Sequence, residues 1–207
     1  MEGDTVLVAP DTYYENLIIQ KSITLTSDAI YDDLSEWTGF AGEYYINNDN
    51  ILNTRIDGSD DTNGEDLQST ILIYSPDDEC ISPTIFGFTI TGGDGTLVPH
   101  EEEEDIEEMR GGGVLSYNAL PILNYNFITD NNSPDLENGG GVNASNGDQF
   151  ERLLNTENTN YSQPRCEGDI DLSYNFYRDN DALYGNTLAT NEYEGSIDMS
   201  NSIFDVY

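Results

Sequence analysis

The sequence predicts an all-β fold of the solenoid type, in which each sequence repeat forms one coil and long insertions lie between coils. The main observation is a strand-like unit that occurs four times, at residues 83–93, 121–131, 170–180 and 197–205. The units are similar in length while the spacing between them varies, as expected where insertions are displaced to one side of a solenoid. Glycine triplets precede two further short strands, at residues 111–113 and 139–141. Glycine permits the positive φ that a tight corner requires.

The other elements are predicted from the runs of β-forming residues that lie outside these units. The first coil is predicted from residues 5–8, 16–19 and 22–26. Strands are predicted again around residues 51–56 and at 70–74. Three long segments lack this pattern and are expected to leave the coils as loops: residues 28–50, 94–110 and 147–167. The whole chain, residues 1–207, is expected to form one domain.

Positions that recur in the aligned units are expected to contact each other in neighbouring coils. Asn126 and Asn175 hold equivalent positions. We expect them to hydrogen-bond to each other, since asparagine tolerates turn geometry and forms ladders between stacked strands. Tyr125 and Tyr174 are also equivalent and are expected to form a two-ring stack, with the inside of the coil as the expected location of both rings.

The charge of the chain limits the partners that it can bind. It has 41 acidic residues against 6 Lys and Arg, which gives a formal net charge of −35. Such a surface repels nucleic acids, anionic lipids and acidic polysaccharides, so no nucleic-acid partner is expected. The acidity fits a secreted or cell-surface protein in a salty or calcium-bearing medium, where counterions screen the repulsion. The alternative is that the charge only keeps the protein soluble.

The ends of the sequence suggest a piece of a longer exported protein. Residues 1–4 lead directly into a strand, without a positively charged leader and without a polar cap over the first coil. We expect a fragment of a secreted or cell-surface protein whose export signal has been removed. No apolar run approaches the ~20 residues that a membrane-spanning helix needs, so membrane insertion is not expected.

The two cysteines, Cys80 and Cys166, precede aligned units that are two coils apart. Strands stack at ~4.8 Å, which places the cysteines roughly 10 Å apart, beyond the reach of a disulfide. Free thiols are therefore expected, unless the loops bring the two residues together. The only histidine, His100, lies in a separate acidic stretch, so no Cys–His catalytic arrangement is indicated.

Residues 3–17, which read GDTVLVAPDTYYENL, resemble the first coil of right-handed parallel β-helix repeat proteins of the pectate-lyase-like superfamily. Residues 82–93 and the Gly-Gly-Gly-Val corners resemble later coils of bacterial secreted members. The resemblance implies a right-handed parallel β-helix with long inserted loops. It implies no particular activity, because this fold hosts enzymes, adhesins and inert spacers.

The catalytic patterns of enzymes with this fold give a test. The Asn-Thr-Asp, Gly-His-Gly and Arg-Ile-Lys patterns of polygalacturonase-like hydrolases do not occur in this sequence, and its Asp-Asp pairs lie in predicted loops. A pectate-lyase-like elimination needs an arginine or lysine base, with calcium to neutralise the substrate carboxylate. Arg178 is the cationic residue that falls on a repeat strand. Its alternative role is an ion pair with Asp130 or Asp179.

Two groups of acidic residues are candidate calcium ligands. Asp130 and Asp179 hold equivalent positions, so their carboxylates should stack about 5 Å apart and repel unless a cation lies between them. A solvated ladder balanced by Arg178 is the alternative. The second group lies in residues 57–66 and consists of Asp57, Asp60, Asp61 and Asp66. This stretch fails the helix–loop–helix calcium pattern, because Thr70 stands where a bidentate glutamate is needed, so only a looser turn site is expected.

The sequence thus favours a non-catalytic module with a structural or binding role. Its expected partner is a neutral glycan or a surface protein, and calcium is the only cofactor expected. The alternative is a calcium-dependent polysaccharide lyase or epimerase of the pectate-lyase-like type. A basic groove along one strand face would favour the lyase, whereas an acidic face with a row of stacked rings would favour neutral-glycan binding.

Overall fold

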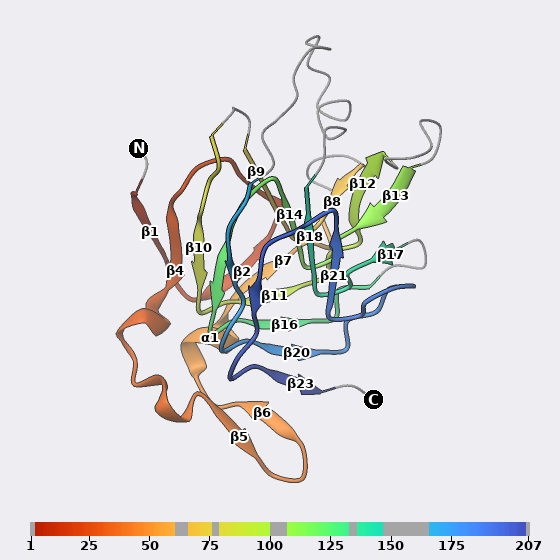
Figure 1. Ribbon diagram of the computed structural model, residues 1–207. Coiled ribbons are helices and arrows are strands. Elements are labelled where there is room, and N and C mark those ends of the chain that lie inside the picture. The colour runs from red at the N-terminus through yellow and green to blue at the C-terminus, as the bar shows by residue number, and fades with distance from the viewer. Residues whose placement is uncertain are drawn as a thin grey trace.

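A computed structural model describes residues 3–60, 66–75, 79–99, 107–132, 136–146 and 166–205. The described residues form an all-β architecture dominated by three parallel sheets, which we name A, B and C (Figure 1). Sheet A contains β1 (Thr5–Val8), β4 (Thr24–Ser27), β10 (Thr84–Phe86), β15 (Ile122–Asn124), β19 (Ile170–Asp171) and β22 (Ile197–Asp198). Sheet B contains β2 (Asp11–Tyr14), β7 (Thr54–Asp57), β11 (Thr89–Thr91), β16 (Phe127–Thr129), β20 (Phe176–Arg178) and β23 (Ile203–Asp205). Sheet C contains β3 (Leu17–Ile19), β9 (Ile71–Tyr74), β14 (Val114–Tyr117), β18 (Val142–Ser145) and β21 (Leu188–Asn191).

The chain visits the three sheets in a fixed order, and we call one passage through A, B and C a circuit. Within the described residues it completes five circuits and then returns once more to A and B. Each strand therefore pairs in parallel with the strand of the next circuit. The four aligned units pair in the predicted register, as shown by Thr84 with Ile122, Ile122 with Asp171, Phe127 with Phe176 and Phe176 with Ile203. This arrangement is compatible with the predicted solenoid.

The space between the three sheets is filled by side chains that alternate with outward-facing residues along each strand. Sheet B contributes an inward row that contains Ile56, Ile90 and Ile128, each at most 2% exposed. Sheet A contributes Ile85 and Leu123, and sheet C contributes further aliphatic residues. Full burial of each such side chain stabilises the fold by about 1.5–3 kcal/mol.

Two rows of buried asparagines line the corners of the circuits. At the A–B corner, between sheets A and B, Asn126 Nδ2 donates to Asn175 Oδ1 at 3.2 Å, as predicted. The side-chain oxygens of Asn126 and Asn175 also accept the backbone N–H of Phe88 and of Asn126, respectively. At the B–C corner, between sheets B and C, Asn131 Nδ2 donates to Asn180 Oδ1 at 2.9 Å. Each row links consecutive circuits through the backbone groups that the corner leaves unpaired.

The glycine triplets form the turn that enters sheet C. Gly111 and Gly139 have φ of 63° and 73°, and Gly185 takes the same place in the next circuit with φ of 68°. A side chain at Gly139 would approach the Val142 carbonyl oxygen to 2.5 Å, so both the conformation and the space favour glycine.

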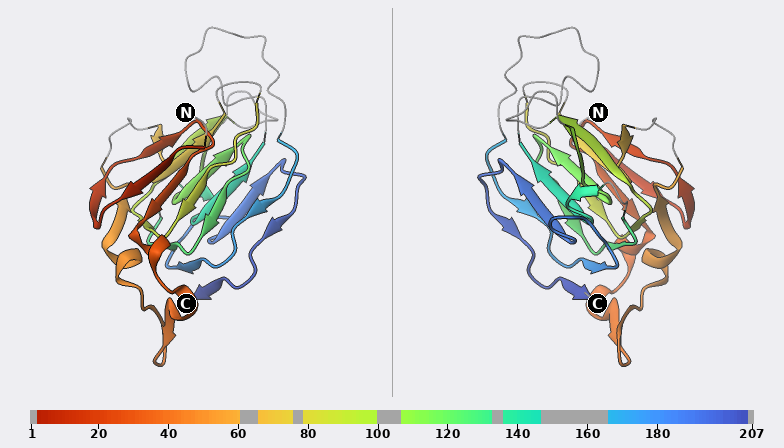
Figure 2. Two further views of the ribbon diagram at one scale, coloured as in Figure 1. Left: turned by 90° about the vertical axis from the view of Figure 1, so that its left-hand side faces the viewer. Right: turned by 90° about the vertical axis from the view of Figure 1, so that its right-hand side faces the viewer.

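The segment expected to form a loop at residues 28–50 instead contains regular structure. It comprises the 3₁₀ helices η1 (Asp28–Tyr31) and η2 (Leu34–Glu36), the hairpin β5 (Thr38–Phe40) and β6 (Tyr44–Ile46), and the helix α1 (Asp49–Asn53). Figure 2 shows that the hairpin projects from the body of the molecule. Trp37, Ile46 and Ile51 of this insertion pack on the outside of the sheets, in a cluster with Phe176.

Other strand predictions need correction. Residues 94–110 are not only a loop, because they contain β12 (Gly95–Pro99) and β13 (Glu107–Arg110), which join β8 (Leu67–Gln68) and β17 (Leu136–Asn138) in a side sheet. Strand β2 was not predicted. The strand expected from residue 51 begins only at Thr54, because Asn48 caps α1 by accepting the Ile51 N–H at 2.9 Å. The third expected loop, residues 147–167, lies outside the described residues up to 165.

Cys80 and Cys166 form a disulfide with their Cα atoms 5.5 Å apart, so the expectation of free thiols is wrong. That expectation assumed that both residues keep the strand spacing of two circuits. Both cysteines lie instead in connections outside the strands of sheet A. Beside Cys80, Ile81 forms only an isolated bridge with Ala119. Because these connections lie outside the sheet, the distance between strands does not fix the distance between the two cysteines, and the connections come close enough for a disulfide. No helix among the described residues is long and apolar enough to cross a membrane.

Candidate functional site

The outer face of sheet B carries a row of polar side chains. Because side chains alternate along a strand, the residues that flank the inward row point away from the interior. One outward position is occupied in successive strands by polar residues, and we call this set the outer row: Asp57, Thr91, Thr129, Arg178 and Asp205. The row combines carboxylates, hydroxyls and a guanidinium at strand spacing, which makes it a candidate site.

At one end of the outer row, Asp57 is paired with Arg55 of the same strand. Arg55 Nε donates to Asp57 Oδ2 at 3.2 Å, and Arg55 Nη2 reaches Thr91 Oγ1 at 3.4 Å. The second carboxylate oxygen, Asp57 Oδ1, accepts the Ser59 N–H at 3.1 Å. Both oxygens of Asp57 are therefore engaged within the chain.

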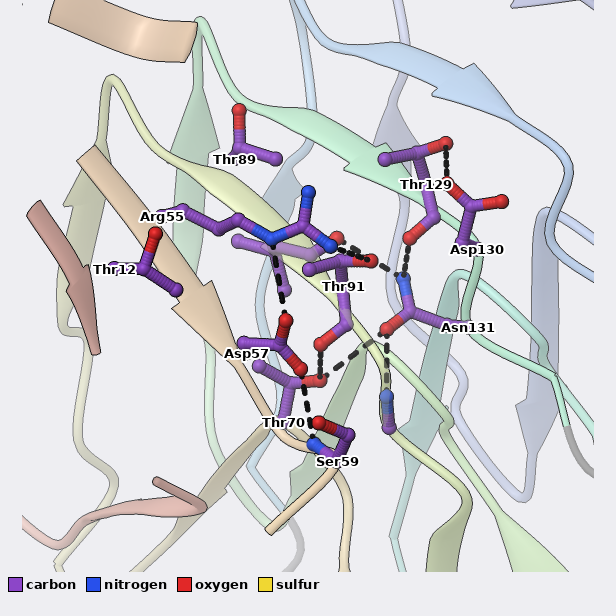
Figure 3. A network of polar contacts seen from close by, with 12 residues as sticks. Thr12, Arg55, Asp57, Ser59, Thr70, Thr89, Thr91, Thr129, Asp130 and Asn131 are labelled. Carbon is purple, nitrogen blue, oxygen red and sulfur yellow. Dashed lines mark hydrogen bonds and ion pairs between the residues drawn. The ribbon is translucent and has the colours of Figure 1, made fainter. Parts of the chain in front are cut away.

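Figure 3 shows that this pair belongs to a polar network that extends to the B–C corner. Thr70 Oγ1 contacts the Thr91 carbonyl at 2.9 Å and Asn131 Oδ1 at 3.2 Å. Asn131 Nδ2 donates to the Thr129 carbonyl at 3.1 Å, and Thr129 Oγ1 donates to Asp130 Oδ2 at 2.9 Å. Thr70, Thr91 and Asn131 are at most 1% exposed, so the network binds strands together rather than facing solvent.

At the other end of the row, Arg178 is paired with Asp205. Its Nε and Nη2 donate to Asp205 Oδ2 at 3.0 and 2.7 Å, and its Nη2 also donates to the Tyr44 carbonyl of the hairpin. The guanidinium lies 4.9 Å from the centre of the Phe176 ring. Arg178 was predicted to pair with Asp130 or Asp179, and this prediction is wrong, because its ion-pair partner is Asp205. Both lie in the turn after the strand with φ of 54° and 50°, whereas Asp205 continues the outer row.

The two predicted metal groups differ in their geometry. Asp130 and Asp179 hold equivalent positions at the B–C corner and are exposed. Asp60 and Asp66 are exposed, and Asp61 lies outside the described residues. Within the described ranges, no three His, Cys, Asp or Glu side chains gather closely enough to hold a metal ion. A cation at Asp57 would compete with Arg55, and at the corner Asp130 Oδ2 already accepts the Thr129 hydroxyl.

A pocket of about 290 Å³ lies beside the second ion pair. Its lining includes Arg178, Asp179, Asp181, Asn186, Thr187 and Asp205. The lining is polar, and its carboxylates outnumber its single guanidinium. Polar groups of this kind bind hydroxyl groups or cations more readily than anions.

The predicted tyrosine stack is confirmed, but its predicted location inside the coil is wrong. The rings of Tyr125 and Tyr174 lie 5.0 Å apart with planes inclined by 16°. They sit outside the A–B corner, because the next residues, Asn126 and Asn175, take the inward positions. Burial, and to a lesser extent the neighbouring Tyr174, raise the pKa of Tyr125.

Three residues of this face were missed by sequence reasoning. Arg55 lies in β7, which was not among the four aligned units, although Thr54–Asp57 shows the same alternation as Thr89–Thr91. Asp205 aligns with Arg178 in the repeat, so the alignment contained the signal for this pair. Tyr44 contacts Arg178 through its backbone and had no sequence signal.

Residues brought together from distant parts of the sequence therefore define this face: β7, β11, β16, β20 and β23 supply the outer row, and the hairpin supplies Tyr44. Comparisons with protein-family models, with curated proteins and with solved structures find no match to this chain.

Proposed function

We propose that this chain forms a right-handed parallel β-helix of a secreted or cell-surface protein and has a non-catalytic, structural and binding role. The repeated A–B–C order and the asparagine rows support a β-helix. Connections between parallel strands of one sheet are right-handed in nearly all proteins, which supports the handedness. The partner would be a neutral glycan or a surface protein, because the net charge of −35 disfavours polyanions.

The observation that carries the non-catalytic role is the pairing of both arginines on the outer face of sheet B. Arg55 is paired with Asp57, and Arg178 with Asp205. A pectate-lyase-like elimination needs a basic group that removes a proton from the substrate. The Nε of each guanidinium is hydrogen-bonded to a carboxylate of the chain, which a substrate would have to displace. The pairing therefore supports a structural role for both arginines.

Export is supported by the disulfide between Cys80 and Cys166, because disulfides persist mainly in oxidising compartments. The acidic composition agrees with an extracellular medium that contains screening ions. Calcium is proposed as a stabilising ion at Asp130 and Asp179, whose equivalent positions bring two carboxylates to neighbouring strands.

The second candidate is a calcium-dependent lyase or epimerase. It is favoured by the pocket beside Arg178, which also contains Asp179 and Asp181. Calcium held there would reduce the repulsion of a uronate substrate, and Arg178 would act as base only if the substrate displaced Asp205. The need for that displacement makes this candidate weaker.

The two candidates are separated by incubating the protein with polygalacturonate and with alginate in millimolar calcium. Elimination creates a conjugated double bond that absorbs ultraviolet light, and proton NMR of the recovered polymer detects epimerisation. We expect neither product above a blank without protein. Calcium-dependent product formation by the natural chain that disappears in Arg178→Ala would overturn the non-catalytic proposal in favour of the enzyme.

A further inference from the structure

One column of equivalent residues at the A–B corner has a positive φ, a backbone conformation that is unfavourable for the two tyrosines in the column. Gly87, Tyr125, Tyr174 and Asn201 occupy the same position in successive circuits, with φ of 80°, 58°, 58° and 58°. Glycine and asparagine adopt this left-handed conformation readily, whereas tyrosine does so at a cost. Two tyrosines in this column therefore point to a benefit that compensates for the backbone strain.

Packing accounts for Tyr125 but not for Tyr174. The Tyr125 ring lies 5.3 Å from the Phe86 ring, 5.5 Å from the Trp37 ring and 5.0 Å from the Tyr174 ring. Tyr174 uses one face of its ring for Tyr125 and is 37% exposed. The next residue of the column is Asn201, which has no ring. Within the described part of the chain, the row of rings thus ends at Tyr174, whose side chain is partly exposed.

The level of the next circuit has the right spacing for a flat ligand. Neighbouring strands lie about 4.8 Å apart, close to the 5.0 Å between the Tyr125 and Tyr174 rings. A ring stacked on Tyr174 would therefore lie level with Asn201. Exposed polar groups surround this level: the Asn201 amide, the Ser200 hydroxyl and the Asp198 carboxylate. The Ser200 N–H donates to Asp198 Oδ1 at 2.8 Å and fixes that carboxylate at the rim.

The geometry points to Tyr174 as the platform of a saccharide-binding site for a neutral β-linked hexopyranose chain, in which one sugar ring continues the row of rings at the level of Asn201. This inference rests on the proposed binding role and specifies its ligand. A hexopyranose with equatorial hydroxyls offers a flat C–H face to an aromatic ring and hydroxyls at its edge. The edge hydroxyls would bond to Asn201, Ser200 and Asp198.

Charge selects a neutral ligand over the alternatives. The Asp198 carboxylate is ionised, since hydrogen bonds from Ser200 hold its pKa below the usual value, and it repels uronates. A guanidinium from a basic protein would also stack on Tyr174. Its attraction is electrostatic and weakens as dissolved salt screens the charges. Stacking of a neutral sugar is insensitive to salt, so the neutral ligand is favoured.

The test measures binding of cellohexaose and laminarihexaose to the natural chain by calorimetry in 1 M NaCl, with a polyarginine peptide and an oligogalacturonate as rival probes. Tyr174→Asn places in this position the residue found at Asn201, which tolerates the conformation. We expect a roughly tenfold loss of affinity for the neutral hexasaccharide. The melting temperature should change by less than about 4 °C, because relief of strain offsets the lost ring contact.

Matched variants keep the outcome interpretable. Tyr174→Phe retains the ring and should retain binding, and Tyr184→Ser removes an exposed tyrosine elsewhere and should have no effect. Equal binding by Tyr174→Asn and the natural chain would overturn the inference, as would binding of neither hexasaccharide or salt-sensitive binding of polyarginine alone. None of these outcomes bears on catalysis, because the polyuronate assay tests the non-catalytic role separately.

Discussion

At the residue scale, the buried asparagines carry a large share of the specificity of this fold. The Asn126 side chain is fully buried, donates to the Ile85 carbonyl at 3.0 Å and accepts the Phe88 N–H at 3.0 Å. A corner of a β-circuit exposes such backbone groups to an interior without water, where each unpaired group costs about 1–3 kcal/mol. Asparagine supplies one donor group and one acceptor on a short side chain, so it pairs both.

We therefore expect Asn126→Ala to lower the free energy of unfolding by about 2–5 kcal/mol, since it leaves one donor and one acceptor unpaired. Urea denaturation followed by circular dichroism measures this loss. Asn53→Ala is the matched control, because Asn53 is exposed at the end of α1 and should change stability by less than about 0.5 kcal/mol. Equal effects of the two substitutions would contradict a structural role for the row.

The sequence was sufficient for the contacts that recur from circuit to circuit. The Asn126–Asn175 bond and the Tyr125–Tyr174 stack were both predicted, because aligned positions of a repeat must lie next to each other. Whether a given side chain points into the interior or away from it was harder to predict. The alternation within a strand is interrupted at the corner, where a positive φ at Tyr125 sends its ring outward and leaves the inward place to Asn126.

At the scale of elements, the insertions behave as a second layer that covers the circuits. The hairpin contacts β20 through Tyr44, whose ring lies 6.5 Å from that of Phe176. In the side sheet, Val98 packs with Leu72 and Leu115 of sheet C. These elements could not be predicted from the repeat, because they occur once and their partners lie in distant circuits. The disulfide was missed for the same reason.

The disulfide should contribute strongly, because Cys80 and Cys166 are 86 residues apart in the sequence and their link restricts the unfolded chain. We expect Cys80→Ser combined with Cys166→Ser to reduce the free energy of unfolding by about 2–5 kcal/mol. Urea denaturation with and without reductant measures the effect. Reductant should destabilise the natural chain to a similar extent and leave the double variant unchanged. A double variant as stable as the oxidised natural chain would refute the link.

At the scale of the whole molecule, the architecture and the charge act against each other. The parallel sheets stack strands at about 4.8 Å, so like-charged residues of successive circuits are brought close together. With a net charge of −35, the folded chain carries a repulsion that the expanded chain relieves. The described ion pairs, Arg55–Asp57, Arg110–Glu108 and Arg178–Asp205, neutralise only a small part of this charge.

Screening should therefore stabilise the protein, and calcium should add to this effect. The screening length falls from about 10 Å at 0.1 M salt to about 3 Å at 1 M, so the melting temperature should rise by several degrees in NaCl. At matched ionic strength, calcium should raise it further if Asp130 and Asp179 bind the ion in the folded state. Asp130→Asn should abolish the calcium increment, since asparagine tolerates the φ of 54°.

Two controls separate specific binding from screening in these melts. Magnesium at the same ionic strength should give the NaCl result, because it keeps its water shell and demands a stricter ligand geometry. Glu36→Gln removes an exposed carboxylate in η2, outside the B–C corner, and should leave the calcium increment intact. Equal melting temperatures in calcium, magnesium and sodium would mean that the acidic residues are only solvated, and would contradict a calcium site at Asp130 and Asp179. A calcium increment that survives Asp130→Asn would place the ion elsewhere on the molecule.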